Sequence, residues 1–116
     1  MIVFKPRKIF YYRNYFKTFY ESLKPDTKKK VNWTIELICN LQRVPAKYFN
    51  HLTDSDGLYE IRIEFNSEIY RVFSFFDEDN LIVLGNGFQK KTAKTPKAEI
   101  QLAEKIKKQY FDEKNQ

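Results

Sequence analysis

Apolar and polar residues alternate most strictly in the segment Tyr59–Phe65. Four apolar residues are interleaved with three charged ones, in the order Tyr59, Glu60, Ile61, Arg62, Ile63, Glu64 and Phe65. An extended chain places alternate side chains on opposite faces, so this pattern predicts a strand with one buried face. The three charged side chains would then line the other face of the sheet.

Two further strands are expected directly after this one. Tyr70–Phe76 is apolar at nearly every position, which is typical of a central strand, and Asn66-Ser67-Glu68 before it has the composition of a hairpin turn. Asp77–Asn80 is a second polar turn, and it leads into the apolar run Leu81–Gly87. Together these segments predict an antiparallel meander.

The N-terminal half has a different period. Lys8–Tyr12 is short, β-branched and aromatic, which predicts a first strand. From Asn14 the apolar residues recur with helical spacing, at Tyr15, Phe16, Phe19, Tyr20 and Leu23. Pro25 is expected to break this helix, and Asp26 is expected to cap a second one that ends at Pro45. The apolar stripe of that second helix consists of Val31, Ile35, Ile38 and Leu41. Residues 46–52 are expected to form a turn or a short helical piece.

The C-terminal part begins with a basic loop, Lys90–Thr95. Thr95 is expected to cap the last helix, with Pro96 at its first position and Tyr110 near its end. Residues 112–116 are expected to be a frayed tail. The predicted order is β-α-α-β-β-β-α in one domain spanning residues 1–116. This is an α+β fold, an antiparallel sheet with a helical hairpin on one face and a C-terminal helix.

Charge is concentrated where the last strand meets the last helix. Lys90, Lys91, Lys94 and Lys97 crowd this crossing, and their mutual repulsion is costly unless an anion binds there. The whole chain carries a formal net charge of +6 at pH 7, with a pI near 9.3. Both features favour an anionic partner, and the lysine cluster favours a phosphate backbone.

Several kinds of chemistry lack the residues they need. The chain has one histidine and one cysteine, which cannot make a zinc site or an internal disulfide. It has no acidic cluster with metal-ligand spacing and no glycine-rich phosphate loop, so no metal and no cofactor are expected. His51 has no evident partners for a Ser-His-Asp arrangement and is expected to be solvated or structural. The lone Cys39 and the lack of a membrane-length apolar run indicate a soluble, cytoplasmic protein with no membrane partner.

Arg71 interrupts an otherwise apolar strand, where a charge is costly unless it is paired or faces a cleft. Two interpretations stay open. Either Arg71 is consumed in a salt bridge with Glu60, Glu64 or Glu68, or its planar fork is presented to a phosphate. Lys90 and Lys91 also have two interpretations, a solvated basic loop or a phosphate contact.

The chain resembles a known family in three stretches, Leu58–Arg62, Ile69–Asp77 and Gly87–Ile100, the last with the signature KKT-x-KTP-x-x-EI. They are similar to the phage-derived HigB-like branch of the RelE/ParE toxin superfamily. The resemblance implies the toxin of a type II toxin–antitoxin pair, a ribosome-dependent mRNA interferase. It also implies a small helix-turn-helix, HigA-like antitoxin that neutralises the toxin and represses the shared operon. Operator DNA would be contacted only through that antitoxin.

The resemblance also implies roles for individual residues. Arg71 matches the arginine that contacts the scissile phosphate, while Arg62 and Lys90 fall at positions of basic residues, with Lys91 beside Lys90. Tyr110 corresponds only loosely to a C-terminal tyrosine that assists attack in the superfamily. The histidine and acidic constellation of some HigB toxins has no counterpart here.

The implied reaction is metal-independent attack of the substrate's 2′-hydroxyl on the adjacent phosphate. Arg71 and Lys90 would stabilise the developing charge, Arg62 or Lys91 would orient the backbone, and Glu60 or a lysine would take the proton. Further RNA contacts are expected from Lys94, Lys97, Lys28 and Lys29. Two other functions share the fold: a gyrase-poisoning toxin that cleaves no RNA, and a non-catalytic binding module.

Overall fold

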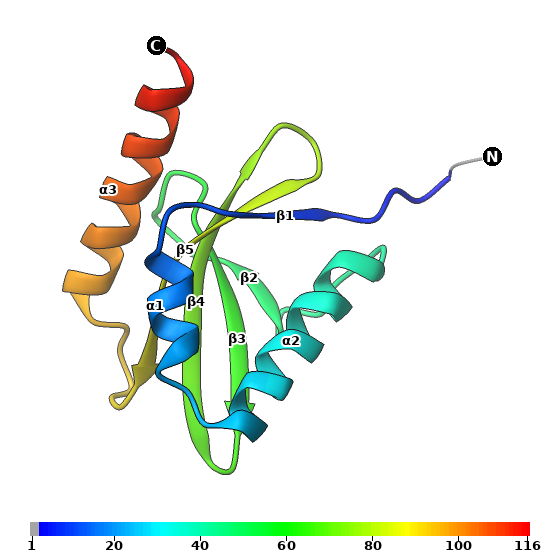
Figure 1. Ribbon diagram of the computed structural model, residues 1–116, viewed down its shortest axis with the longest axis vertical. Coiled ribbons are helices and arrows are strands. Elements are labelled where there is room, and N and C mark those ends of the chain that lie inside the picture. Colours follow the sequence, from blue (N-terminus) through cyan, green and yellow to red (C-terminus); the bar gives the residue numbers. More distant parts are fainter. Residues whose placement is uncertain (1–2) are drawn as a thin grey trace.

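The computed structural model describes residues 3–116 and has an α+β fold (Figure 1). Its elements in chain order are β1 (Lys8–Tyr11), α1 (Tyr15–Glu21), α2 (Pro25–Asn40), β2 (Phe49–His51), β3 (Tyr59–Phe65), β4 (Glu68–Asp77), β5 (Leu81–Lys90) and α3 (Lys97–Lys114). The predicted fold class is confirmed, and β3 and β4 lie where the alternating and apolar runs placed them. β5 begins at Leu81 as predicted but continues past Gly87 to Lys90, so Lys90 ends the strand instead of opening the loop.

The five strands form one sheet in the order β1-β5-β4-β3-β2. β2, β3, β4 and β5 pair antiparallel, as the predicted meander requires. β1, however, pairs with β5 in parallel, with Lys8 opposite Leu81, so the sheet is mixed and the prediction of a wholly antiparallel sheet was wrong in this detail. A strand's direction depends on the path of the chain between pairing partners, and the apolar period of a single strand does not encode that path.

β2 was also missed, because residues 46–52 were expected to form a turn or a helical piece. It is a three-residue edge strand in which Phe49 lies opposite Ile61 and stacks on Tyr59 at 4.9 Å between ring centroids. Three residues are too few to show a period. The cross-strand aromatic contact therefore identifies β2 only once β3 is in place.

Both longer helices begin differently from what the sequence suggested. Pro25 is the first residue of α2, with Lys24 as its N-cap, so Asp26 lies inside the first turn instead of capping it. Proline suits this position because its missing N–H would be unpaired there in any case. In α3 the N-cap is Pro96 rather than Thr95, and Lys97 is the first helical residue.

α3 also continues through Lys114, past the point at which fraying was expected. Its last turn is held to the sheet by side chains, since Lys114 Nζ donates to both carboxylate oxygens of Asp77 at 2.8 Å. Tyr12 donates to Glu113 at 2.8 Å in the same turn. These tertiary contacts explain why the helix persists almost to the end of the chain.

The helical hairpin α1–α2 covers one face of the sheet, as predicted. Val31, Ile35 and Ile38 of α2 are buried there, against a cluster from β3, β4 and β5 that includes Ile61, Ile63, Tyr70, Val72, Ile82 and Leu84. Leu41 does not continue the buried stripe, because it lies just beyond the last turn of α2 and is 39 % exposed.

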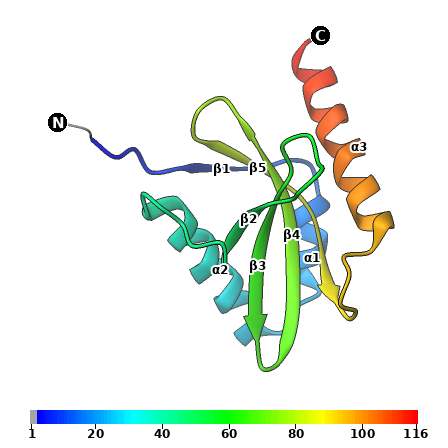
Figure 2. The same cartoon turned by 180° about the vertical axis from the view of Figure 1, so that it is seen from behind.

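α3 covers one end of the opposite face, where Ala103 and Ile106 pack with Phe73, Phe75 and Val83. Helices therefore lie on both sides of the sheet. At the other end of this face, which is turned toward the viewer in Figure 2 with α1 behind it, β3 and β4 carry the charged residues of the alternating strand.

Gly87 sets how closely α1 approaches the sheet. A Cβ at this position would lie 2.4 Å from the ring of Phe19, which is closer than real Cβ contacts come. The missing side chain therefore lets the aromatic ring of Phe19 in α1 pack directly on β5.

Candidate functional site

Strand pairing places four of the five predicted catalytic side chains on one face of the sheet. Arg62 lies opposite Arg71, and Lys90 lies opposite Ile69, two positions along β4 from Arg71. Opposing residues of an antiparallel pair share a face, and so do residues two apart on one strand. Glu60, Arg62, Arg71 and Lys90 thus form what we call the charged face.

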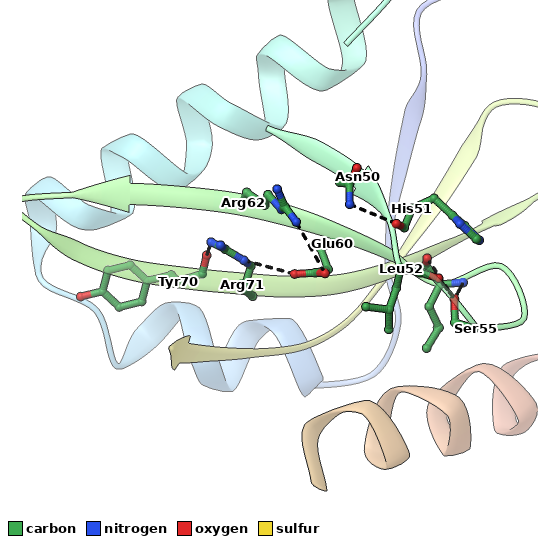
Figure 3. A network of polar contacts seen from close by, with 9 residues as sticks. Asn50, His51, Leu52, Ser55, Glu60, Arg62, Tyr70 and Arg71 are labelled. Carbon is green, nitrogen blue, oxygen red and sulfur yellow. Dashed lines mark hydrogen bonds and ion pairs between the residues drawn. The ribbon is translucent and has the colours of Figure 1, made fainter. Parts of the chain in front are cut away.

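The centre of the charged face is one carboxylate shared by two guanidinium groups (Figure 3). Arg71 Nε lies 3.2 Å from Glu60 Oε2, and Arg62 Nη2 lies 4.0 Å from Glu60 Oε1. Glu60 and Arg71 are only 5 % and 6 % exposed, whereas Arg62 is more open to solvent. Two positive charges against one negative charge leave this group with a net positive charge.

Burial acts against the charge on Arg71. Loss of solvent lowers the pKa of the Arg71 guanidinium, and the neighbouring Glu60 carboxylate partly reverses this effect. Arg62, directly opposite, lowers the pKa of Arg71 further because like charges repel. An additional anion at this place would relieve both effects.

The hydrogen bonding of the two arginines is also incomplete. The Nε groups of Arg62 and Arg71 are buried and have no hydrogen-bond partner among residues 3–116. Arg71 Nε is close to Glu60, but its N–H is not well aligned with the carboxylate, and Arg71 Nη1 donates at 3.1 Å to the carbonyl of Tyr70. Buried donors without acceptors are costly, so this arrangement favours binding of an anionic acceptor.

The salt-bridge interpretation of Arg71 is confirmed with Glu60 as the partner. The hydroxyl of Tyr70 donates to Glu68, and Glu64 is exposed. Contact of Arg71 with a phosphate stays a prediction.

The lysine loop joins the charged face to α3. Lys90 is half-buried at the end of β5, Lys91 and Lys94 are exposed in the loop, and Lys97 opens α3. Within the part of the chain that the structure describes, none of these four lysines forms an ion pair. Their charges are therefore available to a bound anion.

Lys28 and Lys29 lie elsewhere. Both are in the first turns of α2, which packs on the opposite face of the sheet, and Lys28 Nζ lies 5.5 Å from the ring centroid of Tyr20. The structure therefore does not bring these two residues together with Arg71.

Tyr110 is separated from the charged face by the length of β4. Its hydroxyl donates to Asp77 at 2.5 Å. Asp77 lies six residues beyond Arg71, roughly 20 Å along an extended strand. Burial and the Asp77 carboxylate raise the pKa of Tyr110 to about 12. This geometry favours a structural role for Tyr110 over assistance in attack.

Sequence reasoning missed two neighbours of the charged face, Asn50 and Phe88. Asn50 of β2 lies opposite Glu60, and Phe88 of β5 lies opposite Arg71. Only the strand register reveals them as neighbours of Glu60 and Arg71, because Asn50 belongs to no motif and Phe88 was part of the Gly87–Ile100 stretch without an assigned role. Phe88 also lines a cleft of about 910 Å³ between α1 and the start of α3, whose charges are mixed and include Lys24, Glu68 and Glu99.

Other possible sites are not seen in residues 3–116. They contain no group of three histidine, cysteine or acidic side chains placed to hold a metal ion. His51 is exposed on β2 and packs edge-on against Tyr59, with 5.2 Å between ring centroids. No helix within the same range is long and apolar enough to cross a membrane.

Comparison with known proteins adds a family. A family model described as Phage derived protein Gp49-like (DUF891) matches residues 18–108, which include the charged face and the lysine loop. No curated protein matches the chain significantly. Because the family match covers most of the sequence, the chain belongs to the Phage derived protein Gp49-like family, a family of RelE/ParE-like toxins in toxin–antitoxin systems.

Proposed function

We propose that the chain is a cytoplasmic mRNA interferase of the HigB-like branch, a toxin that cuts messages on the ribosome and is neutralised by a helix-turn-helix antitoxin. The observation that carries this proposal is the buried Arg71, whose contact with Glu60 is misaligned and which lies opposite Arg62 on a net positive sheet face. A phosphodiester supplies the acceptor oxygens that these guanidinium groups lack.

The reaction needs only groups of the substrate and of the charged face. The 2′-oxygen of one nucleotide bonds to the adjacent phosphorus, and the bond from phosphorus to the 5′-oxygen of the next nucleotide breaks. The products are a 2′,3′-cyclic phosphate and a 5′-hydroxyl. Glu60, or a lysine of the neighbouring loop, accepts the 2′-hydroxyl proton, and the leaving 5′-oxygen takes up a proton from solvent water.

Arg71 and Lys90 are proposed to stabilise the charge that builds on the phosphate oxygens. Preorganised donors of this kind are usually the largest single contribution to such catalysis, and losing one typically lowers the rate about a hundred- to a thousandfold. Arg62 and Lys91 would hold the RNA backbone on either side, with Lys94 and Lys97 extending the contact along the loop.

The test is a map of new mRNA 5′ ends minutes after induction, in cells that produce the wild type, Arg71→Ala or Lys105→Ala. Lys105 is an exposed cation of α3 and serves as the charge-matched control. We expect breaks at a fixed position of translated codons in the wild type and the control, and their loss in Arg71→Ala.

Two results would contradict the proposal. Arrested growth with intact messages would indicate a gyrase-poisoning toxin, and normal growth with intact messages would indicate a non-catalytic module. Unchanged cleavage in Arg71→Ala would leave the ribonuclease activity standing but remove Arg71 from it.

A further inference from the structure

An aromatic surface lies on the outer side of α2, away from the sheet. Trp33 is 46 % exposed, and Tyr48, in the segment before β2, meets it at nearly a right angle with 5.7 Å between ring centroids. We call Trp33, Tyr48 and their flanking lysines, Lys30 and Lys47, the Trp33 platform. An exposed tryptophan on a helix that already buries its opposite side has no role in the core.

Each of the two aromatic rings has a lysine ammonium over it, so a base that stacks on Trp33 would use the face that Lys30 does not cover. Lys30 Nζ lies 4.2 Å from the Trp33 ring centroid, and Lys47 Nζ lies 5.5 Å from that of Tyr48. In the region that the structure describes, neither lysine forms an ion pair with a carboxylate. Aromatic faces next to unpaired cations are the combination that binds single-stranded nucleic acid, because bases stack on the rings while phosphates meet the cations.

The platform continues into a hollow of about 270 Å³ along α2. Its walls combine apolar side chains with one amide and one carboxylate, contributed by Trp33, Glu36, Leu37, Asn40 and Leu41. The carboxylate of Glu36 disfavours a phosphate in the hollow itself. An amide and a carboxylate can instead receive the amino and carbonyl edges of a nucleobase, so the chemistry of the hollow suits a base.

The platform adjoins the charged face around the edge of the sheet. The carbonyl of Tyr48 accepts a hydrogen bond of 2.8 Å from the backbone N–H of Arg62. Two residues further on, Asn50 lies opposite Glu60, and Figure 3 shows β2 running beside this ion-paired group. A strand that leaves the charged face over β2 would therefore meet the platform next.

We propose that the Trp33 platform binds single-stranded RNA outside the cleavage site, with a base stacked on Trp33 and backbone phosphates bound by Lys30 and Lys47. A protein partner fits less well, because lysines are depleted in the cores of protein interfaces. The choice of RNA rests on the proposed function, but the test below does not require cleavage.

The experiment uses a fluorescein-labelled, unstructured 12-mer of 2′-O-methyl RNA. This probe has no free 2′-hydroxyl, so binding can be measured without cleavage. Trp33 is the only tryptophan of the chain, so its intrinsic fluorescence reports on the platform alone. Anisotropy of the fluorescein label reports total binding by every surface of the protein.

We expect saturable quenching of Trp33 with the same midpoint as the anisotropy change. Lys30→Gln/Lys47→Gln should weaken binding about tenfold and reduce the slope of log affinity against log salt by about 1.4. Lys5→Gln/Lys105→Gln, which removes two exposed lysines that form no ion pair within the described residues, is the matched control and should leave the quenching unchanged. Trp33→Ala should weaken binding by a similar factor in the anisotropy measurement.

Binding by anisotropy without quenching of Trp33 would overturn the proposal and place the RNA elsewhere on the protein. Quenching by the purified antitoxin but not by the RNA probe would identify the platform as a protein interface, which also overturns it. The proposed function can fail independently of this inference. If Trp33 is quenched by the RNA probe but cellular messages stay intact, the platform still binds RNA and only the proposed cleavage is contradicted.

Discussion

β4 carries two buried charged residues on the same sheet face, Arg71 toward one end and Asp77 at the other. Their surroundings differ in how fully they satisfy the charge. Both carboxylate oxygens of Asp77 are bonded, to Lys114 at 2.8 Å each and to Tyr110 at 2.5 Å. Arg71, by contrast, has a single misaligned contact with a carboxylate, from its Nε to Glu60 Oε2 at 3.2 Å. The first arrangement stabilises the fold, whereas the second leaves capacity for a ligand.

The position of α3 explains the contrast. The helix packs along the Asp77 end of the face and supplies Tyr110 and Lys114 from its last turns. At the Arg71 end the chain instead forms the exposed lysine loop between β5 and α3, which contains cations and no carboxylate. At one end of the face α3 covers the sheet and the carboxylate of Asp77 is fully hydrogen-bonded, and at the other end this face is covered by no helix of residues 3–116 and carries a net positive charge. We call these the closed end and the open end.

The largest difference between the two ends should appear in catalysis. Arg71→Ala is expected to lower cleavage of a ribosome-bound message about a hundred- to a thousandfold, because it removes a donor to the phosphate. Tyr110→Phe should keep cleavage near the wild-type rate, since Tyr110 lies at the closed end. Primer extension on programmed ribosomes measures both. If Tyr110→Phe were as inactive as Arg71→Ala, the Tyr110 end of the face would also take part in cleavage, and the proposed difference between the two ends would be wrong.

The next largest effect concerns the stability of the open end. Glu60→Ala leaves Arg71 buried without its carboxylate and should lower the free energy of unfolding by about 3–5 kcal/mol. Glu60→Ala/Arg71→Met should recover most of this loss, because it removes the unpaired charge as well. Urea unfolding of both variants measures the difference. Equal destabilisation of the single and double variants would show that Arg71 does not need Glu60.

The closed end should show a pH-dependent effect of intermediate size. Lys114 and Tyr110 hold the pKa of Asp77 below its usual value, so Asp77 favours folding above its unfolded pKa of about 3.9, and this contribution is lost as the pH falls through the lower, folded pKa. Asp77→Asn should therefore destabilise the protein at pH 7, by about 1–2 kcal/mol, since Lys114 is half exposed. The difference in the free energy of unfolding between Asp77→Asn and the wild type should become smaller in acid.

Urea unfolding at pH 7 and at pH 3 measures this gap. Asp79→Asn, in the exposed turn two residues further along the chain, is the matched control and should show little change at either pH. A gap that stayed constant with pH would mean that the charge of Asp77 contributes nothing to stability.

The smallest effect on stability is expected in the lysine loop. Lys90→Gln/Lys91→Gln should change the free energy of unfolding by less than about 0.5 kcal/mol, because neither lysine forms an ion pair within the described residues. The same variant should flatten the salt dependence of RNA binding by about 1.4 in slope. A large loss of stability would show that these lysines have a structural role.

Much of the fold was readable from local patterns. The alternation of Tyr59–Phe65 predicted both the strand and its charged face, and the polar turn at Asn66 and Ser67 adopts the positive φ angles, 52° and 65°, of a tight hairpin. Helix starts were less accurate. Pro25 was expected to break the first helix but is the first residue of α2, and Pro96 was expected at the first helical position but is the N-cap of α3. Such errors of one position arise because a proline both ends one helix and suits the start of the next.

The candidate site was readable only in part. Arg71 stood out as a charge inside an apolar strand, but the sequence alone could not tell which of Glu60, Glu64 and Glu68 pairs with it, or how well. Asn50 and Phe88 were invisible, because each becomes a neighbour of the site only through its strand partner. Lys28 and Lys29 were grouped with the RNA contacts by charge, although α2 carries them to the other side of the sheet.

The sequence by itself determined four of the five strands, the helical faces, the positive charge and the family, because period, composition and motif are properties of neighbouring residues. Only the tertiary structure decided that β1 runs parallel to β5, that Glu60 pairs with Arg71, and that Asp77 is satisfied by the last turns of α3. Each of these depends on residues far apart in the chain. Whether a buried charge is satisfied or left with an unpaired donor is set by those distant partners, which local sequence does not specify.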